Sequence, residues 1–223
     1  MEKALSLHAN EAFEELDEEG KRICRFVFTT LTQQGEDNRG IRHPEKVSAI
    51  ANIAKASLKD TIAVIDKFRA PGRAFITPGT DVELTGDSVI DISHESIMRI
   101  WDKLKQWIQD EAESIQLYKR LSEASAMYQS GKAGLWRPPD LLIASNWRKK
   151  FQPNLAWAKR YDPAFERAMV FLDASESRYK NEERHKIKIQ KKGIETYPRL
   201  CHYPWCGGHC VFWAHVLCQP TEG

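Results

Sequence analysis

The sequence predicts a mainly α-helical protein with a small β-wing, organised as a winged helix-turn-helix followed by a helical arm. Over residues 1–109, amphipathic helical patterns alternate with short runs of alternating apolar and polar residues, and beyond them only helical patterns follow. The 223 residues are enough for one large or two small domains. The net charge of +2 does not by itself require nucleic acid or a membrane surface as a partner.

The first helices are predicted from apolar spacing and from turn residues. One helix is expected over residues 11–33, ended by Gln33-Gln-Gly35, and a polar, turn-rich run with one short strand follows over 36–44. Ser48 and Ser57 stand where N-caps belong, so they are predicted to begin two further helices. The second of these helices should end at Pro71-Gly72, because neither residue continues a helix well.

Two short strands are predicted next, over residues 74–77 and 89–92, with a loop between them. Ser93 then stands in the position of an N-cap, which places His94 in the first turn of the following helix. Backbone N–H groups at a helix start favour negative charge, so a histidine there is suited to touch a bound phosphate. The alternative is that His94 only packs or caps.

Helices alone are predicted for the rest of the chain. The expected elements are a helix over 101–130 broken near Asp110, one starting at Pro138-Pro139, a short piece over 151–159 and a long helix from Pro163. The predicted organisation is a winged-helix domain over 1–109, a helical arm over 110–180, a basic helical extension over 181–192 and a tail over 193–223.

The charge pattern argues against DNA as the partner of the winged helix. The predicted recognition helix is barely basic, and the loop between the strands is acidic, with no Lys or Arg between Thr77 and Ser93. A DNA-facing wing should be basic, because neutralising phosphates supplies most of the affinity. The charged residues concerned are Lys59, Asp60, Asp66, Lys67 and Arg69 in the helix and Asp81, Glu83 and Asp87 in the loop.

Several segments together resemble bacterial STAND signalling NTPases of the novel STAND NTPase type, the group often fused to WD40 or other repeats. The most characteristic is Ile92-Ser-His-Glu-Ser-Ile-Met-Arg-Ile-Trp101 followed by Leu104-Lys-Gln-Trp-Ile108. The likeness covers residues 4–180, and it rests on the order and spacing of the segments. The others are Ala4–Asn10 with Leu16-Asp-Glu-Glu19, Leu121-Ser-Glu-Ala-Ser125 with Tyr128, Pro138-Pro-Asp-Leu-Leu142, Trp157-Ala158 and Phe171-Leu-Asp-Ala-Ser-Glu176.

The resemblance implies a regulatory role within a larger ATPase. In that family a P-loop module precedes this region and a repeat sensor follows it, so those two parts are the implied partners, and ADP or ATP with Mg²⁺ is the cofactor of the intact parent. The chain holds no G-x-x-x-x-G-K-[ST] motif, so no cofactor and no ATP hydrolysis are expected of this segment alone. His94 matches the winged-helix histidine that contacts the nucleotide phosphate in the inactive, ADP-bound form. Nucleic acid is not expected as a partner. The expected location is the cytoplasm.

The last residues are rich in cysteine and histidine, and three interpretations stay open. Cys201, Cys206, His209 and Cys210 are residue types that bind zinc. Alternatively, a one-nucleotide frame shift from Gly193 permits an apolar run of about 20 residues, the length that spans a bilayer, directly after a basic segment. The tail would then be out of frame, and only the intact frame would tether the parent to a membrane. The third interpretation is a disordered native tail.

Two other functional classes remain beside the STAND interpretation. One is a stand-alone winged-helix adaptor or DNA-binding regulator, which a basic wing would have favoured. The other is a zinc-binding protein, which depends on the tail.

Overall fold

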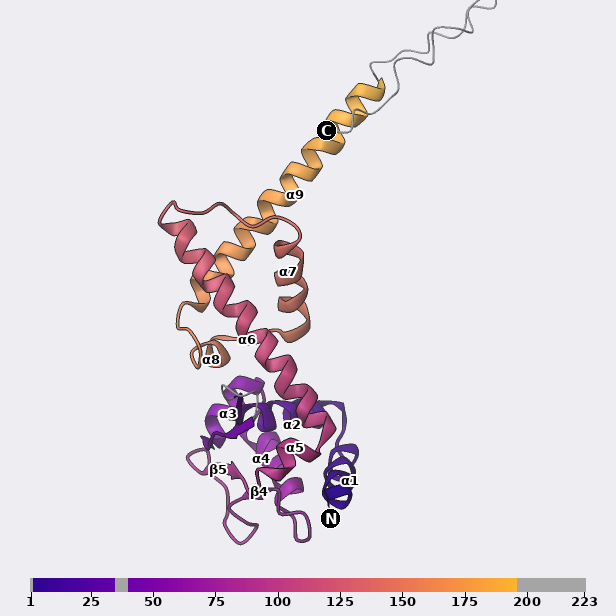
Figure 1. Cartoon of the computed structure of the whole chain (residues 1–223), viewed down its shortest axis with the longest axis vertical. Helices are drawn as coiled ribbons and strands as arrows, with labels where there is room; N and C mark the ends of the chain where they lie inside the picture. The colour runs from indigo at the N-terminus through magenta and orange to yellow at the C-terminus, as the bar shows by residue number, and fades with distance from the viewer. Residues whose placement is uncertain (1, 35–39, 196–223) are drawn as a thin grey trace, which may run out of the picture. The chain divides into compact units, whose positions relative to one another are not determined.

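The computed structural model describes residues 2–34 and 40–195. The chain divides into two compact units, Met1–Glu176 and Ser177–Gly223, and each is described by itself. The described residues are mostly helical, with short antiparallel strands near the N-terminal end of the sequence (Figure 1). The predicted fold class, mainly α with a small β-wing, is confirmed.

The first unit contains a mixed N-terminal part and a helical part. The N-terminal elements are α1 (Glu2–Glu14), α2 (Glu18–Thr30), β1 (Thr32–Gln34), β2 (Gly40–Arg42), β3 (Glu45–Lys46), α3 (Val47–Ala54), α4 (Leu58–Arg69), β4 (Ile76–Thr77), β5 (Val89–Ile92) and α5 (Ser96–Ile100). The helical elements are α6 (Asp102–Gln129), α7 (Asp140–Phe151), α8 (Leu155–Ala158) and α9 (Phe165–Glu195), and α9 continues into the second unit.

The strands form the small sheet that a winged helix requires. Its order is β3-β5-β4, all antiparallel, with Glu45 opposite Ile90 and Ile76 opposite Ile92. One strand of this sheet precedes the helix pair α3–α4 and two follow it. The two strands after the pair were predicted, but the strand expected within residues 36–44 is β2, which does not join this sheet. The loop between β4 and β5, residues 78–88, is called the wing below. A separate antiparallel pair, β1 with β2, places Thr32 opposite Arg42.

The predicted single helix over residues 11–33 is wrong at both ends. The helix is interrupted between α1 and α2. There the Asp17 backbone is extended, and its side chain accepts a 2.7 Å hydrogen bond from the Gly20 N–H. An N-cap of this kind satisfies a backbone donor that a helix start leaves unpaired. At the other end α2 stops at Thr30, because Thr32–Gln34 pair as strand β1.

Only one of the two serine caps predicted before α3 and α4 is present. Ser57 caps α4, since its Oγ accepts from the Asp60 N–H at 3.1 Å. Ser48 lies inside α3, which begins at Val47 without a side-chain cap. The Val47 and Ser48 N–H groups donate instead to the carbonyls of Ser88 and Gly86, so the end of the wing does the capping.

The helix after β5 breaks at Trp101 and not at Asp110. Trp101 is extended (φ −82°, ψ 104°) between α5 and α6, and α6 then runs unbroken through Asp110. The break allows the Trp101 ring to turn fully into the core, where its Nε1 donates to Asn10 Oδ1 at 2.8 Å. A continuous helix would present this ring along the α6 face instead.

The N-terminal core surrounds Trp101 and is aromatic. The Trp101 ring centroid lies 5.1 Å from that of Phe28 and 5.2 Å from that of Trp107, both close to edge-on. Phe68 and Phe13 complete the cluster, at 6.1 and 6.4 Å. Trp101 is fully buried in this core, and Trp107 is partly buried against it.

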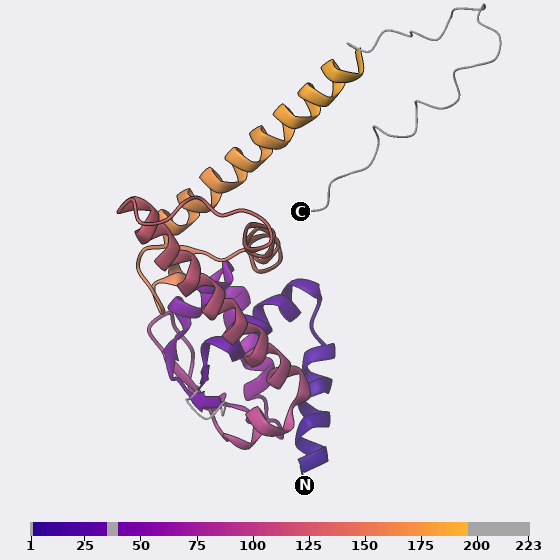
Figure 2. The ribbon, with the colours of Figure 1, turned by 45° about the horizontal axis from the view of Figure 1, so that its top comes forward.

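Helix α6 connects the two parts of the first unit. It packs against α2 at its start and against α7 further along, which Figure 2 shows from a second side. The helical part has its own aromatic cluster around the buried Tyr118, whose ring lies 5.4 Å from Trp157 and 6.5 Å from Trp147. The Tyr118 hydroxyl donates to the Asp162 carbonyl at 2.6 Å.

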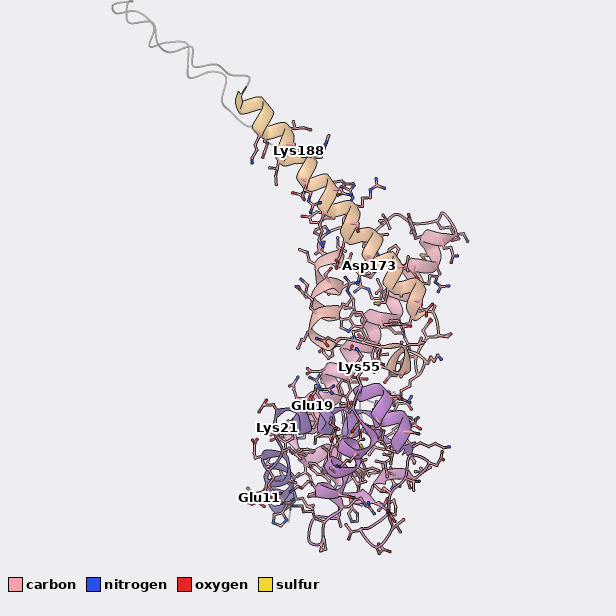
Figure 3. All side chains as sticks on the ribbon, turned by 180° about the vertical axis from the view of Figure 1, so that it is seen from behind. Glu11, Glu19, Lys21, Lys55, Asp173 and Lys188 are labelled. Atoms are coloured by element: carbon pink, nitrogen blue, oxygen red, sulfur yellow. The ribbon has the colours of Figure 1, made fainter. Side chains whose placement is uncertain are left out.

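The described part of the second unit, residues 177–195, is the continuation of α9. Its side chains are mostly exposed and charged, as at Lys188 in Figure 3. Ion pairs join Arg178 to Glu182 and Lys186 to Glu183. Within the described residues, no helix combines the length and the apolar character that crossing a bilayer needs.

Candidate functional site

The site predicted at His94 lies in the turn between β5 and α5. Ser93 does not cap the helix as predicted: its N–H donates to the Phe75 carbonyl at 2.9 Å, and its Oγ donates to the Ala74 carbonyl at 2.5 Å. These bonds fix the residue before His94 to the segment before β4. The His94 carbonyl accepts from the Ile97 N–H at 3.2 Å, so His94 precedes α5 rather than lying within its first turn.

The His94 side chain is exposed, whereas its backbone is anchored on both sides. Ile92, two residues before it, and Ile97, three residues after it, are both buried in the core. The imidazole therefore stands on a fixed backbone and contributes nothing to the packing of the core. The exposure argues against packing, but the His94 carbonyl does accept the Ile97 N–H at the start of α5, so the alternative that His94 only caps stays open and the phosphate contact stays a prediction.

Arg42 is a basic side chain that contacts this turn, and no motif in the sequence pointed to it. Its Nη1 donates to the Ile92 carbonyl at 3.3 Å and lies 3.3 Å from Asp91 Oδ2. Its Nε lies 3.7 Å from Glu95 Oε1. Arg42 thus contacts residues on both sides of His94, where its guanidinium is paired with the carboxylates of Asp91 and Glu95.

No sequence signal would have placed Arg42 here. It belongs to the turn-rich run over 36–44, and it reaches β5 only because β1 pairs with β2 and β3 pairs with β5. Gly40, two residues before Arg42, lies close to Met98 on α5, since a Cβ atom at position 40 would lie 2.9 Å from the Met98 sulfur.

The wing is held in place by a buried arginine. Arg69, at the end of α4, is 4% exposed, and it donates to the carbonyls of Pro78, Gly79 and Val82. Its Nη1 also pairs with Asp66 at 2.7 Å. Arg69 is one of the basic residues of the predicted recognition helix, but its guanidinium is buried and hydrogen-bonded to the wing carbonyls, so it is not available to DNA.

Little positive charge is left on the exposed face of α4. Lys67 Nζ lies 3.5 Å from Glu15, so of the basic residues in this helix only Lys59 has no carboxylate partner among the described residues. The groove of about 860 Å³ between α4 and the wing is lined by three carboxylates, Asp66, Asp81 and Glu83, and by two basic side chains, Lys59 and Arg69. Its lining is therefore acidic on balance.

The carboxylates of residues 110–113 on α6 point to different neighbours. Asp110 pairs with Arg25 at 3.2 Å, and Glu111 Oε1 accepts from Trp157 Nε1 at 2.5 Å. Glu113 accepts from Gln109 at 3.0 Å. Among the described residues, no group of three or more possible metal ligands occurs. The structure does not describe residues 196–223. The predicted zinc ligands lie there, namely Cys201, Cys206, His209 and Cys210, and so does most of the tail to which the reading-frame prediction applies.

Comparison with known proteins assigns the family. The model of the family Novel STAND NTPase 1 matches residues 1–134, which is more than half of the chain. The chain belongs to this family. No curated protein and no solved structure matches it. The matched residues include the wing, the His94 turn and all of α6.

Proposed function

We propose that this chain is the regulatory winged-helix and arm segment of a STAND signalling ATPase. In this proposal it holds the nucleotide-binding module in its ADP-bound, closed state and relays input from a repeat sensor domain. ADP or ATP with Mg²⁺ belongs to that module, and the segment itself hydrolyses no nucleotide. The proposed location is the cytoplasm, where such a module finds its nucleotide.

The observation that carries the proposal is the exposed His94 on an anchored turn. A phosphate contact needs a side chain that is free to donate and is held in one place, because ordering a mobile side chain on binding costs conformational entropy. The His94 imidazole is exposed, and the backbone that carries it is anchored on both sides, which supports the proposed contact. The neighbouring Arg42 already pairs with Asp91 and Glu95, so the proposal rests on His94 itself.

The acidic wing supports a protein partner over DNA. Because Arg69 is hydrogen-bonded to the wing and Lys67 is paired with Glu15, α4 offers little positive charge to a phosphate backbone. An acidic groove of this kind repels DNA and suits a partner protein with basic residues. The alternative of a DNA-binding regulator is therefore not favoured.

The test is ADP retention in a full-length family protein that carries this segment next to its nucleotide module. His94→Ala should speed ADP release by about 10-fold to 100-fold and raise basal activation, since one hydrogen bond to a charged group contributes about 1.5–3 kcal/mol. His8→Ala, an exposed histidine on α1, is the matched control and should leave release unchanged. Unchanged ADP retention in the His94 variant would count against the proposal.

A further inference from the structure

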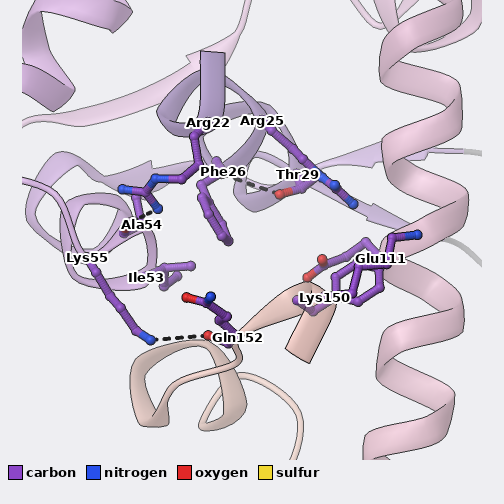
Figure 4. A pocket seen from close by; sticks show the side chains of 11 residues that line it. Arg22, Arg25, Phe26, Thr29, Ile53, Ala54, Lys55, Glu111, Lys150 and Gln152 are labelled. Atoms are coloured by element: carbon purple, nitrogen blue, oxygen red, sulfur yellow. Dashed lines mark hydrogen bonds between the residues drawn. The ribbon is translucent and has the colours of Figure 1, made fainter. Parts of the chain in front are cut away.

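A cavity of about 230 Å³ lies within the first unit, between α2, the end of α3, α6 and the end of α7 (Figure 4). Arg22 and Arg25 enter it from α2, Lys55 follows α3, and Lys150 comes from the last turn of α7. Basic side chains from elements far apart in the sequence thus converge on one space. This cavity is separate from the His94 turn, and none of the residues named so far as phosphate-binding lines it.

Two of the basic side chains have structural tasks that explain their presence. Arg22 Nη1 donates to the Ala54 carbonyl at 2.6 Å, and Lys55 Nζ donates to the Gln152 carbonyl at 3.2 Å. Both carbonyls lie at helix ends, where cations are favourable because the last C=O groups are unpaired. These two residues would be expected there even if the cavity bound nothing.

Lys150 has no such task. It donates to no carbonyl and pairs with no carboxylate among the described residues; its Nζ lies 5.2 Å from the ring centroid of Phe151. Arg25 pairs with Asp110, and its guanidinium also lies 5.3 Å from the Phe151 ring centroid. Two cations therefore gather at one aromatic ring that lines the cavity.

The inner wall of the cavity is apolar and ends at a carboxylate. Phe26, Ile53 and Phe151 line both this cavity and a smaller space of about 20 Å³ behind it. Glu111 also lines both spaces. Its Oε1 accepts from Trp157 and from the Tyr161 hydroxyl, and its Oε2 has no partner among the described residues. An unused acceptor therefore lies beyond an apolar wall and a cationic opening.

We propose that this cavity binds a small organic anion, a phosphate or carboxylate with a compact aromatic or apolar body. The anionic group would lie at Lys150 and Arg25, and the body would lie against Phe26, Ile53 and Phe151. A cavity of about 230 Å³ has room for a compact ligand such as a single substituted ring. The lining is mixed, with an apolar wall beside charged and polar side chains that would orient the ligand.

Such a ligand would tie the arm to the N-terminal elements. It would contact α2 and α3 on one side and α7 on the other, so its binding energy would stabilise the packing between them. The site would give the segment an input that is independent of the nucleotide.

The experiment is a titration of the isotope-labelled full chain, followed by backbone NMR shifts, with phenyl phosphate, inorganic phosphate and phenol as probes. Phenyl phosphate should shift the signals of residues around Phe151 and Phe26 in a saturable way. Inorganic phosphate lacks the ring and phenol lacks the charge, so each should bind at least 10-fold more weakly. Raising the ionic strength should weaken phenyl phosphate binding, since exposed charges are screened.

A matched pair of lysine variants makes the test specific. Lys150→Gln should weaken phenyl phosphate binding about 5-fold, whereas Lys149→Gln, the exposed neighbour that does not line the cavity, should not change it. Both lysines are exposed, so neither change should unfold the chain. The proposal is overturned if no saturable shifts appear at the cavity, if all three probes bind alike, or if the two variants behave alike. The experiment uses no nucleotide module, so its outcome is independent of the proposed His94 role.

Discussion

The two aromatic cores of the first unit are built on different principles. The N-terminal core places Trp101 among Phe13, Phe28, Phe68 and Trp107, and the one polar atom of its central ring bonds to Asn10. The core of the arm places its rings where each polar atom reaches a partner in the interior. Trp147 Nε1 donates to Ser114 at 2.6 Å, Trp157 Nε1 donates to Glu111, and the Tyr118 hydroxyl donates to Asp162.

This difference separates stability from adaptability. An apolar aromatic core depends on the area it buries and on close packing, and pH does not change either. A core that includes a half-buried carboxylate, here Glu111, depends on the protonation of that group. We therefore expect the N-terminal part to carry most of the stability of the first unit and the arm to carry its response to conditions.

The largest expected effect is the loss of Trp101. Trp101→Ala should lower the free energy of unfolding by about 3–5 kcal/mol, because it removes a fully buried ring and leaves a cavity among four aromatic neighbours. Urea denaturation of the full chain measures this change. Trp101→Phe retains most of the packing and should cost clearly less; an equal cost for the two variants would mean that the bond to Asn10 matters more than the ring.

The next effect concerns the arginine that holds the wing. Arg69→Met should cost about 3 kcal/mol, since it removes charge-assisted bonds to several wing carbonyls and a partner of Asp66 while keeping an unbranched apolar stem. Hydrogen exchange should show faster exchange in residues 78–88 in particular. Arg69→Lys should restore only part of the stability, because an ammonium cannot reproduce the planar fork of the guanidinium. Full stability in the methionine variant would contradict the clamp.

The same contrast determines what the sequence could predict. The N-terminal part was predictable because its apolar residues keep helical and strand periods, so the order of helices and strands and the position of β5 followed from spacing. The prediction missed the breaks at Asp17 and Trp101, and it misplaced a cap at Ser48. At Trp101 and Ser48 a tertiary contact decides, such as the capping of α3 by carbonyls of the wing. At Asp17 the decisive contact is local, the N-cap bond from the Gly20 N–H.

Site residues divide in a similar way. His94 was singled out because it lies within a family-like segment; the structure places it at an exposed turn, and its phosphate role stays a prediction. Arg42 and Glu111 could not be found, since neither belongs to a motif and each acquires its role from elements distant in the sequence. The domain boundary predicted between residues 109 and 110 stays a prediction.

A smaller effect is expected at the start of α2. Asp17→Ala removes the acceptor for the Gly20 N–H and should cost about 1 kcal/mol, the usual cost of losing an N-cap. Thermal unfolding of the full chain measures it. Asp17→Asn keeps a capping oxygen and is the matched control, so it should remain close to the original protein. A loss as large as that of Trp101→Ala would indicate that the break between α1 and α2 itself supports the core.

The smallest effect at neutral pH, and the one that best separates the two cores, is expected at Glu111. Burial raises the pKa of its carboxyl above the ordinary value of 4.5, against the opposing hydrogen bonds from Trp157 and Tyr161 and the charges of Arg160 and Arg25. The folded state therefore holds the proton more tightly than the unfolded state. Between the unfolded and the folded pKa the folded state binds more protons, so the contribution of Glu111 to stability falls as pH rises through this window.

Glu111→Gln keeps the shape and an acceptor oxygen but cannot ionise, so this decline above pH 4.5 should disappear while stability at pH 7 changes by less than about 1 kcal/mol. Urea denaturation of both proteins between pH 4 and 7 measures the difference in slope. Glu113→Gln, on the same helix and exposed, is the control and should keep the original slope. If the Glu111 variant kept it as well, the pH response would have to come from elsewhere, and the arm core would be as insensitive to pH as the core around Trp101.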